Sequence, residues 1–358
     1  MKSKYKFSEL IEEISEQNTE LKYGLDDIVG VTIEKGLIPT IANLQQTALN
    51  KFYIVKPDTF VYNPRTHGVR LGMGFNKTNY TYITSWNNIA FKVKDDALRI
   101  LNPEYLWLYF NRSEWDRETN YHAWGSSTIV FSWNTFLNLE IQIPEKSYQD
   151  NLVRQYNAIK RRIALKQQIN DNLEATVQSL YQNMFIDNAD IASWKQGTVG
   201  DVLQLQRGHD LPRAEMLGGD YPVAGSTGTI GYHNQYTAKA PVIVMGRSGN
   251  IGNPRLYLCD CWTHNTSLYV KQLYQAEYLW AFYLLKNLNY DGFVGGSAVP
   301  TLNRNDVHAY SIPIPPLELQ KTFANRAIKL IIHKENNNSE IVKLQKMQDV
   351  VLTTISSR

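Results

Sequence analysis

Four loops carry the side chains with which this 358-residue chain could do chemistry. They span residues 62–77, 206–213, 225–235 and 246–255, and they are rich in Gly, Asn, Ser and Arg. Arginine can fork onto guanine, asparagine pairs with adenine, and serine, threonine and lysine mostly hold phosphates. Glycine lets the backbone turn tightly and approach a partner closely. These residue types suit recognition of a ligand.

Catalytic motifs have little support in the sequence. The pair Gly72 and Gly74 is too short a signal for a cofactor loop and predicts a plain turn, and no GxxxxGK[ST] phosphate loop occurs. The segment 20–22 resembles the tail of a nuclease motif without its preceding Pro-Asp strand, so we interpret it as a solvated helix end. No set of nucleophile, base and orienting group stands out, and the sequence predicts no catalysis.

Two cysteines one residue apart, Cys259 and Cys261, form no disulfide framework. Together with His264 they could supply three metal ligands. A structural zinc site usually has four ligands, and thiols in strands are commonly small apolar residues. We therefore predict that the chain holds no metal.

The composition is that of a soluble globular protein, with 43% hydrophobic and 20% charged residues, and it is long enough for two domains. The 37 Lys and Arg against 34 Asp and Glu give a formal charge of +3, which by itself argues for no partner. No apolar run reaches the length of a membrane span, and the N-terminus turns polar before a signal-peptide core could form. We expect a cytoplasmic protein without membrane contact.

Two long stretches must position the loops. Residues 149–185 contain no Gly or Pro, so we predict one helix of about 55 Å, and residues 319–358 repeat the pattern. Such helices need partners, and heptad seams predict that they pair antiparallel as a coiled coil. Polar residues interrupt both seams near their middle, which favours pairing of the two over two unrelated surface helices. The apolar seam consists of Leu152, Tyr156, Ile159, Ile163, Leu173, Val177 and Leu180, and of Phe323, Leu330, Ile341, Leu344 and Val351.

Four landmarks recur in the same order at offsets of about 170 to 173 residues, nearly half the chain. The repeat predicts a tandem duplication with pseudo-two-fold symmetry, in the α+β class: two globular mixed α/β domains and two long helices forming an antiparallel coiled coil. We expect a first domain over 1–147, a first helix over 148–189, a second domain over 190–316 and a second helix over 317–358. The landmarks are residues 104–107 and 277–280, 125–127 and 295–297, 141–144 and 312–315, and Gln149 and Gln320.

A further set of motifs lies mainly in the second half. It consists of Trp194, residues 200–202, Arg207-Gly208, residues 221–223, 225–231, 244–249, and 314–317 leading into Gln320. This order resembles a target-recognition domain of the DNA-specificity (S) subunit of a Type I restriction-modification system. The first half is more divergent, and it retains residues 60–65 and the turn at 125–127. The resemblance covers nearly the whole chain.

The resemblance implies a function. In that family each globular domain grips one half of a split, asymmetric DNA site, and the paired helices set the spacer between the halves. The helices also dock two adenine-N6 methyltransferase subunits, and restriction-translocase subunits join at the periphery. S-adenosylmethionine then belongs to the methyltransferase, and ATP and Mg to the restriction subunit, so we expect no cofactor in this chain. The S subunit itself is not an enzyme, and such systems are bacterial or archaeal.

Loop residues are the candidates for contact with double-stranded DNA. Arg65 and Arg247 lead, because both follow a strand end at roughly equivalent places in the repeat. The low net charge is explained if the methyltransferase partners supply much of the grip on the DNA backbone. In the first domain the candidates are Asn63, Arg65, His67, Arg70, Lys77, Trp124, Ser126 and Ser127. In the second they are Arg207, His209, Arg213, Ser226, Thr227, Tyr232, His233, Arg247, Ser248, Asn250, Arg255, Ser297 and Arg304.

One alternative comes from another functional class. A duplicated, non-enzymatic scaffold could use the same paired loops to bind another protein or a carbohydrate. Exposed Tyr and Trp would serve that role as well, and the modest charge would need no explanation. A neighbouring gene for an adenine methyltransferase would favour DNA recognition.

Overall fold

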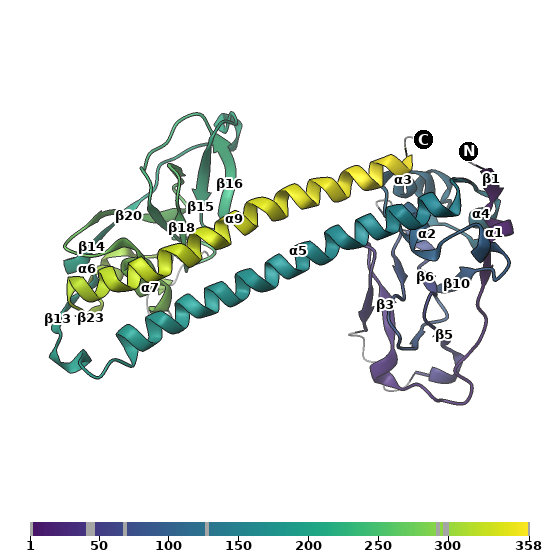
Figure 1. Ribbon diagram of the computed structural model, residues 1–358, viewed down its shortest axis with the longest axis horizontal. Helices are drawn as coiled ribbons and strands as arrows, with labels where there is room; N and C mark the ends of the chain where they lie inside the picture. Colours follow the sequence, from purple (N-terminus) through teal and green to yellow (C-terminus); the bar gives the residue numbers. More distant parts are fainter. Residues whose placement is uncertain are drawn as a thin grey trace. The chain divides into compact units, whose positions relative to one another are not determined.

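The computed structural model describes residues 3–40, 47–66, 70–125, 129–290, 294–295 and 301–356. The chain divides into two compact units, which we call unit 1 (Met1–Leu165 with Ile341–Arg358) and unit 2 (Lys166–Glu340). Each unit combines a sheet-rich globular part with segments of two long helices, α5 (Lys146–Tyr181) and α9 (Leu317–Ser356) (Figure 1). No helix in these described ranges is long and apolar enough to cross a membrane.

The described residues of the globular part of unit 1 form short strands and four short α-helices. Its elements are β1 (Ser3–Lys6), α1 (Phe7–Leu10), β2 (Ile11–Glu13), β3 (Val29–Val31), β4 (Leu37–Pro39), β5 (Tyr53–Val55), β6 (Phe60–Tyr62), β7 (Arg65–Thr66), β8 (Met73–Phe75), β9 (Tyr82–Thr84), β10 (Ile89–Val93), α2 (Pro103–Phe110), α3 (Ser113–His122), β11 (Ile129–Val130), α4 (Trp133–Asn138) and β12 (Glu140–Ile143).

Unit 2 has the same kinds of element. They are β13 (Lys195–Thr198), α6 (Val199–Val202), β14 (Leu203–Arg207), β15 (Tyr221–Gly225), β16 (Gly228–His233), β17 (Val242–Gly246), β18 (Gly252–Tyr257), β19 (Trp262–Thr263), β20 (Ser267–Leu273), α7 (Tyr278–Asn287), β21 (Val294–Gly295), β22 (Thr301–Leu302), α8 (Arg304–His308) and β23 (Ser311–Ile314).

The two units share the topology of their terminal strand pair and of their central sheet. In each, the first strand pairs antiparallel with the strand that precedes a long helix, β1 with β12 in unit 1 and β13 with β23 in unit 2. The central antiparallel sheet has the order β2-β10-β6-β8 in unit 1 and β14-β20-β17-β18 in unit 2. The predicted mixed α/β fold with two sheet-rich domains and long packed helices is thereby confirmed.

Aromatic side chains fill the core of unit 1. Phe7, Phe110, Trp115 and Phe136 are all fully buried, and ring centroids lie 4.8 Å apart for Phe7 and Phe136 and for Phe110 and Trp115. Rings of this size bury large apolar areas and pack edge to face. The core therefore joins α1, α2, α3 and α4 into one layer against the sheet.

One segment differs from the prediction. The sequence predicts a single helix over 103–115, but the chain ends α2 at Phe110 and starts α3 at Ser113. Arg112 between them is extended and buried, its Nε donates to the Tyr109 carbonyl at 2.9 Å, and its guanidinium lies 3.7 Å from the centre of the Tyr109 ring. This local cation–π contact stabilises the break between α2 and α3.

The long helices pack against each other within each unit. In unit 1 Ile163 of α5 clusters with Ile341 and Leu344 of α9. In unit 2 Val177 of α5 shares a core with Phe323 of α9. All twelve apolar positions of the predicted seam are buried or half-buried, as knobs-into-holes packing requires.

The polar seam residues in unit 2 bind one another. Asn337 is 3% exposed; its side-chain carbonyl accepts from Lys166 Nζ at 2.8 Å, and its amide donates to Asn170 Oδ1 at 2.9 Å. Lys166 also lies 2.9 Å from the Glu340 carboxylate. A buried polar network that is fully paired specifies one register, because a slip would leave its members unsatisfied.

A half-buried carboxylate ties the helices of unit 2 to its globular part. Glu174 of α5 pairs with Lys334 of α9 at 2.8 Å and with Lys286 of α7. It also accepts from the Tyr283 hydroxyl at 3.3 Å. Burial alone would raise the pKa of Glu174, but the hydrogen bonds and charges of both lysines outweigh it and hold the pKa below its usual value.

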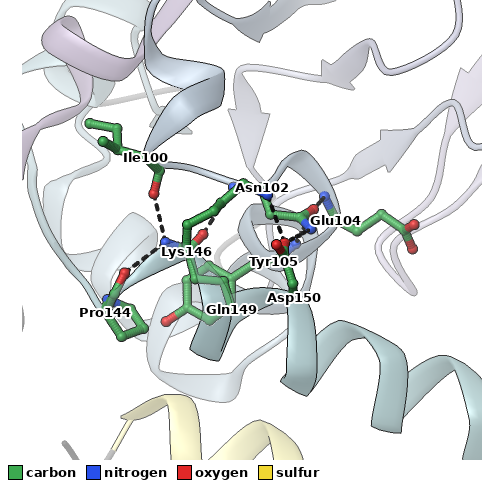
Figure 2. Close-up of polar contacts among 8 residues, drawn as sticks. All are labelled: Ile100, Asn102, Glu104, Tyr105, Pro144, Lys146, Gln149 and Asp150. Carbon is green, nitrogen blue, oxygen red and sulfur yellow. Dashed lines mark hydrogen bonds and ion pairs between the residues drawn. The ribbon is translucent and has the colours of Figure 1, made fainter.

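A buried glutamine anchors the start of each long helix. In unit 1 Gln149 is fully buried, and its Nε2 donates to the carbonyls of Ile100 and Pro144, both at 2.7 Å (Figure 2). Its Oε1 accepts from the Asn102 N–H at 2.9 Å. Asn102 in turn caps α2, because its side chain accepts from the N–H of Glu104.

Unit 2 repeats this anchor. The Nε2 of Gln320 donates to the Pro315 carbonyl at 2.9 Å, and its Oε1 accepts from the Glu277 N–H at 2.9 Å. Glu277 caps α7 as Asn102 caps α2. The two glutamines recur in the sequence because each joins a long helix to the start of a short one.

We expect Gln149→Leu to lower the free energy of unfolding by about 3 kcal/mol, since it leaves one buried N–H and two carbonyls unpaired. Urea denaturation of the full chain measures the change. The matched control is Gln155→Leu, because Gln155 lies exposed on the same helix, and its effect should stay within about 0.5 kcal/mol. Equal losses for both variants would contradict the anchor.

Candidate nucleic-acid interface

Loops of unit 2 converge on residues 264–266, the connection between β19 and β20. The Arg247 N–H donates to the Thr266 carbonyl at 3.0 Å. The Ser226 N–H donates to the Thr266 hydroxyl at 3.3 Å. These contacts bring the loop after β17 and the loop after β15 to one place.

Two glycines allow this close approach. A Cβ added at Gly208 would lie 2.2 Å from the His264 carbonyl oxygen, and one at Gly246 would lie 1.6 Å from the Asn250 carbonyl oxygen. Both distances are far below van der Waals contact, so no other residue fits without moving the backbone. The glycines therefore fix how the loops pack.

Asn250 holds two of the loops together. Its amide donates to the Ser226 carbonyl at 3.2 Å, and its Oδ1 accepts from the Asn253 amide at 2.8 Å. Both polar ends of this side chain are thus engaged within the protein. Arg207 is also steadied, since its Nε donates to the Asn265 carbonyl at 3.4 Å while much of its side chain stays exposed.

The structure brings one group of the predicted residues together and separates the rest. Around residues 264–266 lie Arg207, His209, Ser226, Arg247, Ser248 and Asn250, with Thr227 exposed beside them. Other predicted residues lie on separate elements: Arg213 in a turn before β15, Tyr232 on β16, Arg255 on β18 and Arg304 on α8.

His233 lies inside unit 2. Its side chain is 8% exposed, and its ring contacts Trp262 edge to face with centroids 5.0 Å apart. Successive strand residues point to opposite faces, so Tyr232 is exposed where His233 is buried. The alternation of side chains along the strand therefore buries His233, which the sequence predicts to lie on the DNA-binding surface.

An open pocket adjoins residues 264–266. Its volume is about 740 Å³, and Arg213, Asp210, Ile230 and His264 contribute to its lining. The His264 ring is held by the Thr266 hydroxyl at 2.9 Å. The sequence motifs did not indicate a role for residues 264–266, although Asn and Thr between two strands are typical of a tight connection.

In unit 1 the corresponding surface lies around Arg65 and Trp124. Arg65 pairs with Val130 of β11, and Val130 exchanges two backbone hydrogen bonds of 3.0 Å with Trp124. The Asn63 side chain accepts from the Arg65 N–H at 2.9 Å. Trp124 is 89% exposed. Four other predicted residues lie outside the described residues: His67, Ser126, Ser127 and Ser297.

Two further cations of unit 1 have partners within the protein. Lys77 lies 2.8 Å from the Glu104 carboxylate. Arg70 is 3.8 Å from the Asp116 carboxylate. The same carboxylate forms an ion pair with the buried Lys35 at 2.7 Å. Burial lowers the pKa of Lys35 although Asp116 opposes the change. Because Lys35 already neutralises Asp116, the positive charge of the exposed Arg70 is left largely uncompensated.

Backbone pairing shows that Arg65 and Arg247 do not occupy equivalent positions of the repeat but differ by one residue. Arg65 pairs with Val130, whereas Ser248 pairs with Thr301. Val130 and Thr301 are 171 residues apart, which is the offset of the repeat. Ser248 is therefore the counterpart of Arg65, and Arg247 is one position earlier. Neighbouring residues of an extended chain point to opposite faces, so the two arginines are not equivalent.

Candidates for a metal site do not meet. In the described part of the chain, no three His, Cys, Asp or Glu side chains are grouped to hold an ion. Cys259 is exposed and Cys261 is buried, and burial raises the pKa of the Cys261 thiol to about 12. A thiol so reluctant to ionise is a poor metal ligand.

Comparison with known proteins supports the resemblance for the second half of the chain. Residues 192–345 match the model of the Type I restriction modification DNA specificity domain. The matched segment covers less than half of the chain and lies mainly in unit 2. A search of curated protein sequences found no match. The predicted resemblance to DNA-specificity subunits is confirmed.

Two solved structures share the fold. The Type I restriction-modification S subunit from M. genitalium matches with a TM-score of 0.65 at 14% identity, over 99% of this chain and 96% of that chain. A structure from a study of complex assembly and conformational transition of the type I R-M system matches with a TM-score of 0.51 at 15% identity, over 99% and 97%. The specificity family is non-catalytic and typically binds no cofactor.

Proposed function

We propose that this chain is a DNA-specificity subunit that reads a split, asymmetric DNA site, with one half-site for each unit. The observation that carries the proposal is one topology used twice with different side chains at equivalent places. Where unit 1 has Arg65 and Val130, unit 2 has Ser248 and Thr301. Two non-identical readers on one chain suit a non-palindromic sequence, whereas a homodimer reads a palindrome.

We infer that α5 and α9 set the spacer between the half-sites. Their paired polar seam supports this role, because a helix pair held in one register is a fixed spacer. For this role we propose the domain boundaries 1–147, 148–189, 190–316 and 317–358, in which each long helix is a separate part. The compact units instead divide both helices near their middle.

We also propose that the helices dock two adenine-N6 methyltransferase subunits, with restriction-translocase subunits outside them. Large apolar side chains on the outer faces of the helices support a docking role: Leu165 is 58% exposed, Val342 50% and Met347 53%. S-adenosylmethionine would be bound by the methyltransferase, and ATP and Mg by the restriction subunit. The DNA partner is double-stranded, and the host is bacterial or archaeal.

Co-expression with the methyltransferase encoded beside it tests the function. Genome-wide detection of N6-methyladenine should reveal a split asymmetric motif only when this chain is present. A cell with the methyltransferase alone is the control. A soluble complex with an active methyltransferase and no new methylation would instead support a scaffold for protein binding.

Arg247→Ala should weaken binding by about 1–3 kcal/mol and relax one position of one half-site. The backbone of Arg247 is held at both ends, because its N–H binds Thr266 and its carbonyl accepts from the Leu302 N–H at 2.7 Å. Its side chain therefore projects from a fixed point. Methylome sequencing measures the relaxed position, with Arg117→Ala in unit 1 as the control. An unchanged motif would show that Arg247 does not read a base.

A further inference from the structure

The same three-chain ribbon occurs at the surface of both units. In unit 1 Val130 lies between Arg65 and Trp124 and pairs with both. In unit 2 Thr301 lies between Ser248 and Gly295 and pairs with both. Trp124 and Gly295 are 171 residues apart, as are Val130 and Thr301. The two ribbons are therefore equivalent, residue for residue.

Directly paired residues of antiparallel chains project their side chains to the same face. One face in unit 1 thus carries Arg65 and Trp124 on either side of Val130, with the outer chains roughly 10 Å apart. The equivalent face in unit 2 carries Ser248, Thr301 and Gly295. A guanidinium and an indole stand in unit 1 where unit 2 has one hydroxyl and no side chain at all.

Neither large side chain on the unit 1 face has a partner among the residues that the structure describes. Trp124 is 89% exposed, and no hydrogen bond or ion pair joins the Arg65 guanidinium to another described residue. Keeping an indole in water forgoes the stabilisation that its burial would give. A flat aromatic ring beside a cation is complementary to a nucleic-acid base beside a phosphate.

Charge favours DNA over a protein or a sugar at this face. Arg65 and Arg70 follow β6 within one loop, and both are exposed. The carboxylate nearest to Arg70 is Asp116, whose charge is balanced by the buried Lys35. Arg65 therefore presents a positive charge on the same face as the indole, which suits the phosphate backbone.

We propose that Trp124 is a wedge that unstacks one base step in the half-site read by unit 1, while Arg65 grips the DNA beside it. Unit 2 lacks the wedge, so its half-site stays stacked. Aromatic and apolar side chains inserted at a base step bend the duplex and extend the contact surface around it. The inference rests on the proposed function and adds an asymmetry between the two half-sites.

Fluorescence of 2-aminopurine tests the wedge, since this base brightens when it loses its stacking neighbours. The full chain is purified with its methyltransferase and bound to duplexes that contain the motif identified by detection of N6-methyladenine. Each duplex has 2-aminopurine at one position of one half-site, and the methylated adenines and their neighbours are left out because a methyltransferase flips its target base out of the stack. The wild-type complex should brighten the probe at one step of one half-site and at none of the other. Trp124→Ala should abolish the signal and weaken binding about 5- to 150-fold.

Tyr121→Ala is the matched control, because Tyr121 is 83% exposed on α3 and lies off the ribbon. It should leave both signal and affinity unchanged, and Trp124→Phe should retain part of the signal. An equal signal for wild type and Trp124→Ala, or no signal at any step of a tightly bound site, overturns the wedge alone. Failure of the wild-type complex to bind any specific duplex overturns the wedge and the proposed function together.

Discussion

Deletion of residues 163–169 together with residues 334–340 is expected to shorten the unread spacer of the methylated motif by about three base pairs. Seven helical residues span about 10 Å, and DNA rises about 3.4 Å per base pair. The two segments are 171 residues apart, so each helix loses the equivalent heptad. Both half-sites should keep their sequences, because no loop is altered. The prediction follows from the proposed spacer role.

The double deletion keeps the remaining seam in phase, since a whole heptad returns the helix to nearly the same face. It also removes both members of the Lys166–Glu340 ion pair, while the buried Asn170 loses its partner Asn337. Deleting residues 163–169 alone is the control, and the mismatched seams should then destabilise the chain. Methylome sequencing of both strains gives the spacer. An unaltered spacer in the double deletion would contradict a ruler made of α5 and α9.

Gly246→Ala is expected to destabilise unit 2 by about 3 kcal/mol and to abolish reading of its half-site. The added Cβ would lie 1.6 Å from the Asn250 carbonyl oxygen and 3.3 Å from that of Ser226. The neighbours are backbone atoms, which cannot swing aside as a flexible side chain would. Thermal unfolding of the complex and methylome sequencing measure the two effects.

Gly249→Ala separates close approach from backbone conformation. Gly249 lies in the same loop with a φ of 78°, and nothing is within 4 Å of an added Cβ. Its replacement should cost only about 1–2 kcal/mol, the usual penalty for a left-handed residue with a side chain. If both variants lose the same stability, strain in the loop and not the contact with Asn250 is the cause.

The long-range organisation could be predicted from sequence because it is periodic. The heptad pattern predicts a first helix over 149–185, and α5 spans Lys146–Tyr181 followed by a π-helical turn. The landmark glutamines mark equivalent ends, and they prove to be buried anchors. Polar seam positions predict pairing of the helices, and Asn337 indeed binds Lys166 and Asn170.

Local geometry at the candidate interface could not be predicted in the same way. The one-residue displacement between Arg65 and Arg247 depends on strand register, which residue types do not specify. His233 is buried because of its phase in β16, and Lys77 is paired with Glu104 from a distant helix. Contacts between loops depend on tertiary packing, so composition identifies the loops but not the side chains that face a ligand.

The glutamine anchors join helix and domain through main-chain atoms alone. Gln149 binds the backbone of Ile100, Asn102 and Pro144, and Gln320 binds that of Glu277 and Pro315. The part of the joint that these glutamines make does not depend on the side chains around it. Mutations can therefore accumulate in the recognition loops, or a whole domain can be exchanged by recombination, while the attachment to the helix persists. Under the proposed function, new DNA targets can evolve without rebuilding the assembly that acts on them.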